Sequence, residues 1–171
     1  MLKLRKNKKG FTLVELIVVI AIMAVLAGTV AGVTVTQLNK KTDDTNKIQA
    51  QKIATSISGL VLGDAGTYII PKGTGTPAST ADAFDTTKLA GLITELGGEF
   101  SGKNISDIAA PAKGDFGVYI SADKSSIVVC FGAKTNNYKV KGYEINTNGV
   151  VKENTTTLPA RFTASGDTET T

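Results

Sequence analysis

The sequence has no histidine and no tryptophan, and its single cysteine is Cys130. Without histidine the chain cannot form a His-ligated metal site, a Ser/His or Cys/His nucleophilic pair, or an imidazole general base. One cysteine cannot close an internal disulfide, and alone it cannot hold zinc or an iron–sulfur cluster. These absences remove most catalytic constellations. We therefore expect a protein that is not an enzyme and that uses no cofactor and no metal.

Acidic side chains are missing from the first ten residues, which carry five basic ones: Lys3, Arg5, Lys6, Lys8 and Lys9. The rest of the chain then holds 14 basic and 15 acidic side chains, so the positive balance belongs to one short arm. A nucleic-acid surface needs clustered cations that contact phosphates. The nearest approach to such a cluster is Lys134, Tyr138, Lys139 and Lys141, which alternation places on a solvated strand face. We predict no nucleic-acid partner.

Proline is absent from residues 11–64, and charged side chains are absent from residues 16–38. After Gly10 the chain reads FTLVELIVVIAIMAVLAGTVAGVTVTQLN, which exceeds the roughly 20 apolar residues that a membrane-spanning helix needs. The basic arm before this segment predicts that residues 1–9 lie in the cytoplasm and that the rest of the chain is exported. A plain single-pass anchor and a secretory signal peptide cut after Ala27 are two interpretations of this pattern. Neither accounts for Glu15, because a carboxylate near the start of an apolar run weakens its insertion.

The stretch KKGFTLVE, residues 8–15, followed by the apolar run, resembles the leader of type IV pilins and pseudopilins. The resemblance covers about residues 8–27. It implies that residues 1–10 are a leader, that a prepilin peptidase cuts between Gly10 and Phe11, and that Phe11 is then N-methylated. It also implies an α+β fold in which a long N-terminal helix packs on a small antiparallel sheet. Many pilins of double-membrane bacteria close a C-terminal loop with a cysteine pair, so the lone Cys130 favours a Gram-positive source.

Glu15 and Phe11 form the predicted assembly pair. Cleavage before Phe11 would create an α-amino group that is largely protonated near neutral pH, and methylation would keep its charge. A carboxylate in apolar surroundings requires a cation, and this amine is the candidate that the segment offers. We expect Glu15 of one chain to meet the Phe11 amine of the same chain or of a neighbour. The alternative is that Glu15 lies in the headgroup region of the membrane.

Two glycines, Gly28 and Gly32, interrupt the apolar helix, and Gly32 stands where many pilins carry a proline. Each costs a helix interior about 1 kcal/mol relative to alanine, so the pair predicts a soft spot. The same glycines could instead form a small-residue face for close helix packing, and the two interpretations are compatible. We expect one helix over residues 11–64, with residues 11–38 as the transmembrane or filament-core half. A break at residues 39–46 is the alternative.

The remaining chain is predicted to be a globular head, residues 65–159, followed by a polar tail, residues 160–171. Residues 67–113 are rich in Gly, Thr, Ala and Pro and are predicted to be mostly loop. Within them, Asp85 or Thr86 could cap a short helix that ends at Gly97-Gly98. Alternation over residues 115–152 predicts three or four antiparallel strands, with residues 127–131 central and a hairpin at residues 146–149. We expect Cys130 to be buried, and we expect Asp43, Asp44, Asp82 and Asp85 to be solvated.

The sequence therefore predicts a structural subunit of an extracellular type IV pilus that polymerises through its apolar helix. Its expected partners are other copies of itself, the prepilin peptidase and methyltransferase, a membrane assembly platform, a cytoplasmic ATPase, and the membrane before assembly. The alternative is a pseudopilin of a secretion or DNA-uptake machine, or a minor pilin.

Overall fold

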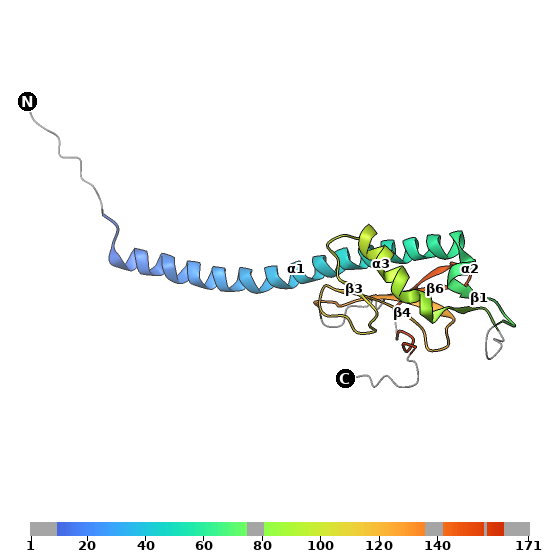
Figure 1. Ribbon diagram of the computed structural model, residues 1–171. Helices are drawn as coiled ribbons and strands as arrows, with labels where there is room; N and C mark the ends of the chain where they lie inside the picture. Colours follow the sequence, from blue (N-terminus) through green and yellow to red (C-terminus); the bar gives the residue numbers. More distant parts are fainter. Residues whose placement is uncertain (1–9, 75–80, 136–141, 156, 163–171) are drawn as a thin grey trace, which may run out of the picture. The chain divides into compact units, whose positions relative to one another are not determined.

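The computed structural model describes residues 10–74, 81–135, 142–155 and 157–162 (Figure 1). The chain divides into two compact units, residues 1–38 and 39–171, which we describe separately. One helix, α1 (Leu13–Gly63), contributes to both units. It is helical through Gly28, through Gly32 and through residues 39–46, so the alternative of a helix broken at residues 39–46 is wrong.

The part of α1 in the first unit is built almost entirely from apolar residues, with threonines as its main polar side chains. Three threonine hydroxyls donate to backbone carbonyls one turn earlier at 2.7–3.2 Å: Thr29 to Leu26, Thr34 to Val30, and Thr36 to Gly32. Hydroxyls bonded in this way do not require water. This half of the helix is therefore compatible with an apolar environment in spite of its threonines.

The second unit contains the remaining elements. They are α2 (Ala65–Tyr68), β1 (Ile69–Ile70), β2 (Ala83–Phe84), the 3-10 helix η1 (Thr86–Lys88), α3 (Leu89–Glu99), β3 (Ile105–Ser106), β4 (Phe116–Ile120), β5 (Ser126–Phe131), β6 (Gly142–Asn146) and β7 (Val151–Asn154). β1 and β2 form a small antiparallel pair, and the other strands form one sheet in the order β3-β4-β5-β6-β7. The predicted α+β class, with a long helix and a small antiparallel sheet, is confirmed.

The antiparallel part of the sheet, β4 to β7, follows the prediction closely. β5 is its central strand, and the β6–β7 hairpin turns at Gly149, whose φ of 72° favours glycine. The sheet differs from the prediction at its first edge, where β3 pairs with β4 in parallel. β3 has only two residues, which is too short for alternation to be visible in the sequence. The predicted strand residues 138–141 lie outside the described residues.

The core of the second unit lies between one face of the sheet and two helices. α1 contributes Ala50, Ile53, Ala54, Ile57 and Val61, α3 contributes Leu89, Leu92 and Leu96, and the strands contribute Phe116, Val118, Ile120, Ile127, Val129, Phe131, Tyr143 and Ile145. The α1 residues recur every three or four positions, so they share one face of the helix. Burial of these side chains is the main stabilising contribution to the head.

The region 67–113 contributes more to the fold than its loop-like composition predicts. Phe84 on β2 is buried in the core, and α3 presents Leu89, Leu92 and Leu96 to it. Asp85 caps η1, because its side chain accepts from the backbone N–H of Thr87 at 2.9 Å. α3 continues through Gly97 and Gly98 to Glu99 and does not end at the glycines as predicted.

The second face of the sheet carries a smaller cluster of Tyr119, Val128 and Cys130, against which Ala109 and Leu158 pack. Cys130 is buried, as predicted, and burial raises the pKa of its thiol to about 12. The chain after β3 lies flat on this face. A Cβ atom added to Gly117 would lie 2.1 Å from the carbonyl oxygen of Ile108, and one added to Gly132 would lie 1.9 Å from that of Ala112. These glycines are therefore required for the close approach of two backbones.

Replacing Gly132 with alanine is expected to destabilise the head by about 1–3 kcal/mol, because the new methyl group would overlap a backbone carbonyl that cannot rotate away. Gly91→Ala is the matched control. Gly91 lies inside α3 with open space around its Cβ position, so this substitution should stabilise the helix by up to about 1 kcal/mol. Chemical denaturation of both variants measures the difference. Equal stability of the two would contradict the close approach.

Residues 157–162 run along the end of β4, where Arg161 forms an antiparallel bridge with Ser121; Leu158 packs on the second face and Phe162 against the core of the first. Phe162 N–H donates to the carbonyl of Ile120 at 2.7 Å, and the Tyr119 hydroxyl donates to the carbonyl of Pro159 at 2.9 Å. Arg161 makes two hydrogen bonds to the carboxylate of Asp107, at 3.0 and 2.8 Å. Residues 160–162 therefore belong to the folded head and not to the predicted polar tail. The rest of that tail lies outside the described residues.

Candidate processing and assembly site

The predicted cleavage site lies just before the first turn of α1. Gly10, Phe11 and Thr12 have no regular secondary structure, and α1 begins at Leu13. Gly10 is exposed, and the Phe11 side chain is 91% exposed. The Gly10–Phe11 peptide bond is therefore outside the helical hydrogen-bond ladder and accessible to an enzyme.

Glu15 is held by a capping box that the sequence analysis missed. The backbone N–H and the hydroxyl of Thr12 both donate to Oε2 of Glu15 at 2.9 Å, and the backbone N–H of Glu15 donates to the Thr12 hydroxyl at 3.3 Å. This reciprocal pattern occurs where Ser or Thr precedes a helix and Glu or Gln follows three residues later. Thr12 and Glu15 have that spacing, so the T-x-x-E signal was present in the sequence.

The capping box fixes the position of the Glu15 carboxylate but uses only one of its two oxygens as a hydrogen-bond acceptor. Both hydrogen bonds that the carboxylate accepts end on Oε2, so within the described part of the chain Oε1 accepts none. The peptide bond of Phe11 is intact here, and its nitrogen carries no positive charge. Glu15 is thus oriented at the start of the helix with one oxygen open to a further donor.

The large apolar side chains of α1 on either side of Glu15 are exposed within the first unit. Leu13 is 73% exposed, Ile17 50%, Val25 68% and Leu38 60%. α1 is the one helix among the described residues that is long and apolar enough to cross a membrane, and its apolar window has no part buried. An apolar surface this continuous indicates a membrane or another apolar helix as its surroundings.

The arrangement combines a basic arm, an accessible Gly-Phe bond, a capped glutamate and an exposed apolar helix. The comparison with protein families decides what it is. Residues 5–31 carry the prokaryotic N-terminal methylation motif. This motif is the leader signature of type IV pilins and pseudopilins, so the predicted resemblance is confirmed. No curated protein and no solved structure gives a match to the chain.

The methylation motif indicates a pilin-like or pseudopilin precursor that is structural and membrane-anchored. It covers residues 5–10 of the predicted leader, the predicted cleavage site, Glu15 and Gly28, and it ends one residue before Gly32. Gly28 and Gly32 both lie in α-helical backbone, and a Cβ atom at either position would have no described atom within 4 Å apart from those of its chain neighbours and of the nearby helix backbone. Among the described residues of a single copy, close packing therefore does not require either glycine.

The prediction that Asp43 is solvated is wrong, because its side chain is fully buried. Its two carboxylate oxygens accept hydrogen bonds from the backbone N–H groups of Lys134 and Thr135, each at 2.7 Å. Burial alone would raise its pKa, but these hydrogen bonds together hold the pKa of Asp43 below its usual value. Asp43 lies on the buried face of α1 with Asn46 and Ala50, a spacing that was visible in the sequence. It fixes the end of β5 and the start of the next segment to α1.

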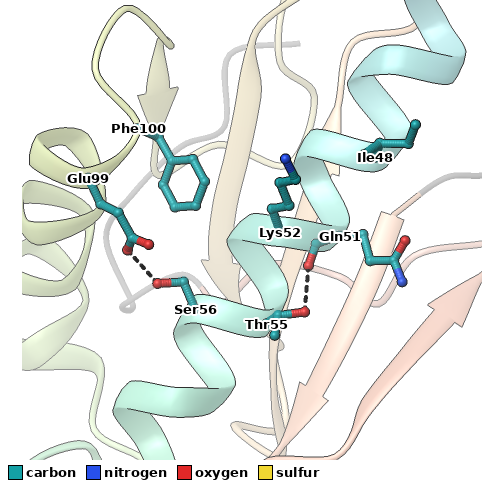
Figure 2. Close-up of a pocket in the computed structure, with 7 residues that line it drawn as sticks. All are labelled: Ile48, Gln51, Lys52, Thr55, Ser56, Glu99 and Phe100. Atoms are coloured by element: carbon teal, nitrogen blue, oxygen red, sulfur yellow. Dashed lines mark hydrogen bonds between the residues drawn. The ribbon is translucent and has the colours of Figure 1, made fainter.

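A shallow groove lies between α1 and the end of α3, and Figure 2 shows the side chains that line it. The hydroxyl of Ser56 donates to Glu99 at 2.5 Å and ties α3 to α1. Ile48, Gln51, Lys52, Thr55 and Phe100 complete the lining of a cavity of about 540 Å³.

Proposed function

We propose that this chain is the structural subunit of an extracellular type IV pilus. It is made as a prepilin, cut between Gly10 and Phe11 by a prepilin peptidase, and N-methylated at Phe11. The observation that carries the proposal is the methylation motif at the start of a long helix whose apolar side chains are exposed. The membrane platform and the ATPase that would drive assembly are partners expected from the resembled family.

The apolar half of α1 has two successive environments in this account. Residues 11–38 first span the bilayer, and they then pack against the same segments of other copies in the filament core. The transfer is feasible because apolar helix neighbours replace lipid, and the charges that move with residues 11–38 are Glu15 and the Phe11 amine created by cleavage. Gly28 and Gly32 would act here, either as a flexible point or as a close contact between neighbouring helices.

Glu15 and Phe11 would set the register of the subunits. After cleavage, the methylated amine of Phe11 is a cation, and Oε1 of Glu15 is the oxygen that the capping box leaves open. An ion pair between Glu15 of one copy and Phe11 of the next would offset the cost of moving the carboxylate from the membrane surface into the filament. Thr12 supports this pair by orienting the carboxylate.

Replacing Gly10 with valine tests the processing step on which the proposal rests. The substituted precursor should accumulate at its full length in the membrane fraction, because a branched side chain beside the scissile bond obstructs an active site shaped for glycine. Cells with the natural chain should release filaments on shearing, visible by electron microscopy and composed of this protein, whereas Gly10→Val cells should release none. If sheared cells with the natural chain yield no filaments, the pilus assignment fails although the methylation motif stands.

A further inference from the structure

Four exposed lysines lie at the end of the head where its part of α1 begins. Lys40 and Lys41 follow Leu38 by two and three residues, and Lys113 and Lys134 come from the head. We propose that these four residues, the lysine collar, bind the anionic headgroups of the lipid surface in which the precursor is anchored. The inference adds to the proposed function and depends only on its membrane-anchored stage.

The hydrogen bonds of Asp43 bring the collar together. The backbone of Lys134 is bonded to Asp43, which lies two residues after Lys41. Lys113 is bridged to Gly132, two residues before Lys134, and the backbone N–H of Gly114 donates to the Gly132 carbonyl at 2.8 Å. Lys113 and Lys134, about 70 and 90 residues further along the chain, therefore lie near Lys40 and Lys41, where the head's part of α1 begins.

Acidic side chains at this end of the sheet offset the collar only in part. Asp43 is buried and accepts from backbone N–H groups, and its charge interacts with that of Lys134, while Asp44 and Asp115 are half-buried. The exposed acid Glu153 is paired with Lys47 at 3.2 Å. Among the described residues, no ion pair involves a collar lysine. The charge presented to solvent here is therefore positive.

The position of the lysines in the chain favours a lipid surface as their partner. At 100° per residue, Lys40 lies roughly 60° and Lys41 roughly 160° around α1 from Asp43, so the two point to different sides of the helix. Lys134 lies on the side of the sheet. Lys40 and Lys41 follow directly after the part of α1 that is long and apolar enough to cross a membrane. Lysines beside such a segment are attracted to anionic lipid headgroups, so a lipid surface is the partner that these residues fit.

The test measures the rate at which each lysine of the full-length chain is acylated by a water-soluble amine reagent, read by peptide mass spectrometry. The chain is reconstituted into nanodiscs of phosphatidylcholine alone or with added phosphatidylglycerol. The collar lysines should react about five-fold more slowly when phosphatidylglycerol is present, and high salt should remove the difference. Lys72 and Lys88 are the internal controls. They lie near β1 and β2, and β2 bonds to Lys124 in the β4–β5 turn at the opposite end of the sheet.

A paired variant separates the collar from general attraction of the protein to anionic lipid. With Lys113→Gln and Lys134→Gln together, Lys40 and Lys41 should regain most of the reactivity that they show in phosphatidylcholine. With Lys72→Gln and Lys88→Gln together, they should stay protected. Equal rates in the two lipids, or equal protection of Lys72 and Lys88, would overturn the inference. Protection that rises with protein concentration in lipid-free micelles would assign the collar to a second copy and would also overturn it. None of these outcomes bears on cleavage at Gly10.

Discussion

Replacing Glu15 with glutamine is expected to abolish filament assembly while leaving cleavage before Phe11 intact. Glutamine can keep the bonds to Thr12, since the capping box accepts Glu or Gln, so the substitution removes the charge alone. The Phe11 amine of a neighbouring copy would then lose its counter-charge in an apolar core. Such a loss costs about 3–5 kcal/mol per contact. Sheared filament yield, with total membrane protein as the reference, should fall more than about a hundred-fold.

Thr12→Val is the matched control, because it weakens the capping box and keeps the charge of Glu15. It removes the hydroxyl of the capping box and leaves the Glu15 charge, at a cost to the helix of about 1 kcal/mol. Filaments should still form, in reduced amount. If Glu15→Gln cells make normal filaments, or if Thr12→Val is the more severe change, the carboxylate acts as a cap only and the proposed pairing with Phe11 is wrong.

Asp43→Asn is expected to destabilise the head by about 2–3 kcal/mol. The amide can accept one of the two backbone N–H bonds, but its NH₂ group would face the other donor and leave it unsatisfied in a buried site. Asp44→Asn is the matched control, because the neighbouring carboxylate is half-buried and makes neither of these bonds. Chemical denaturation of the full-length chain in detergent measures both. Equal losses would contradict the role given to Asp43.

The pH dependence of stability provides a separate check on Asp43. Its pKa in the folded chain is lowered, so the unfolded chain takes up a proton first as pH falls. The stabilisation by Asp43 is therefore complete above the usual aspartate pKa of about 3.9 and is lost as pH falls through the lower folded value. The natural chain should lose stability more steeply in this acid range than Asp43→Asn does. If the free energy of unfolding falls equally with pH in the natural chain and in Asp43→Asn, the two hydrogen bonds of Asp43 are not charge-assisted.

Patterns that repeat over many residues allowed most of the fold to be predicted. The absence of proline and the apolar run predicted α1, and alternation predicted β4. A short run that is apolar on both faces predicted β5 as a central strand, and the Asn-Gly pair at the hairpin predicted the β6–β7 turn. Each of these signals is local, so it does not depend on knowing which distant segments meet. The leader was recognisable for the same reason, because Gly10, Phe11 and Glu15 lie within six residues of one another.

The features that were missed depend on contacts between distant residues or on very short elements. Asp43 looked like a surface acid because its partners, Lys134 and Thr135, are about 90 residues away. Nothing in the sequence around Gly132 indicates that the backbone carbonyl of Ala112 lies against it. The capping box of Thr12 and Glu15 is different: its spacing was local and readable, but the charge of Glu15 drew the interpretation toward an ion pair alone.

The intact mass of the protein recovered from the surface of its cells tests the central claim most directly. The account predicts a chain that begins at Phe11, with one methyl group on its α-amine and the apolar helix retained. A chain that still carries the residues before Phe11 would indicate a plain membrane anchor, and a chain that begins at Gly28 would indicate a secreted protein that has lost its signal peptide. Either result would contradict the account.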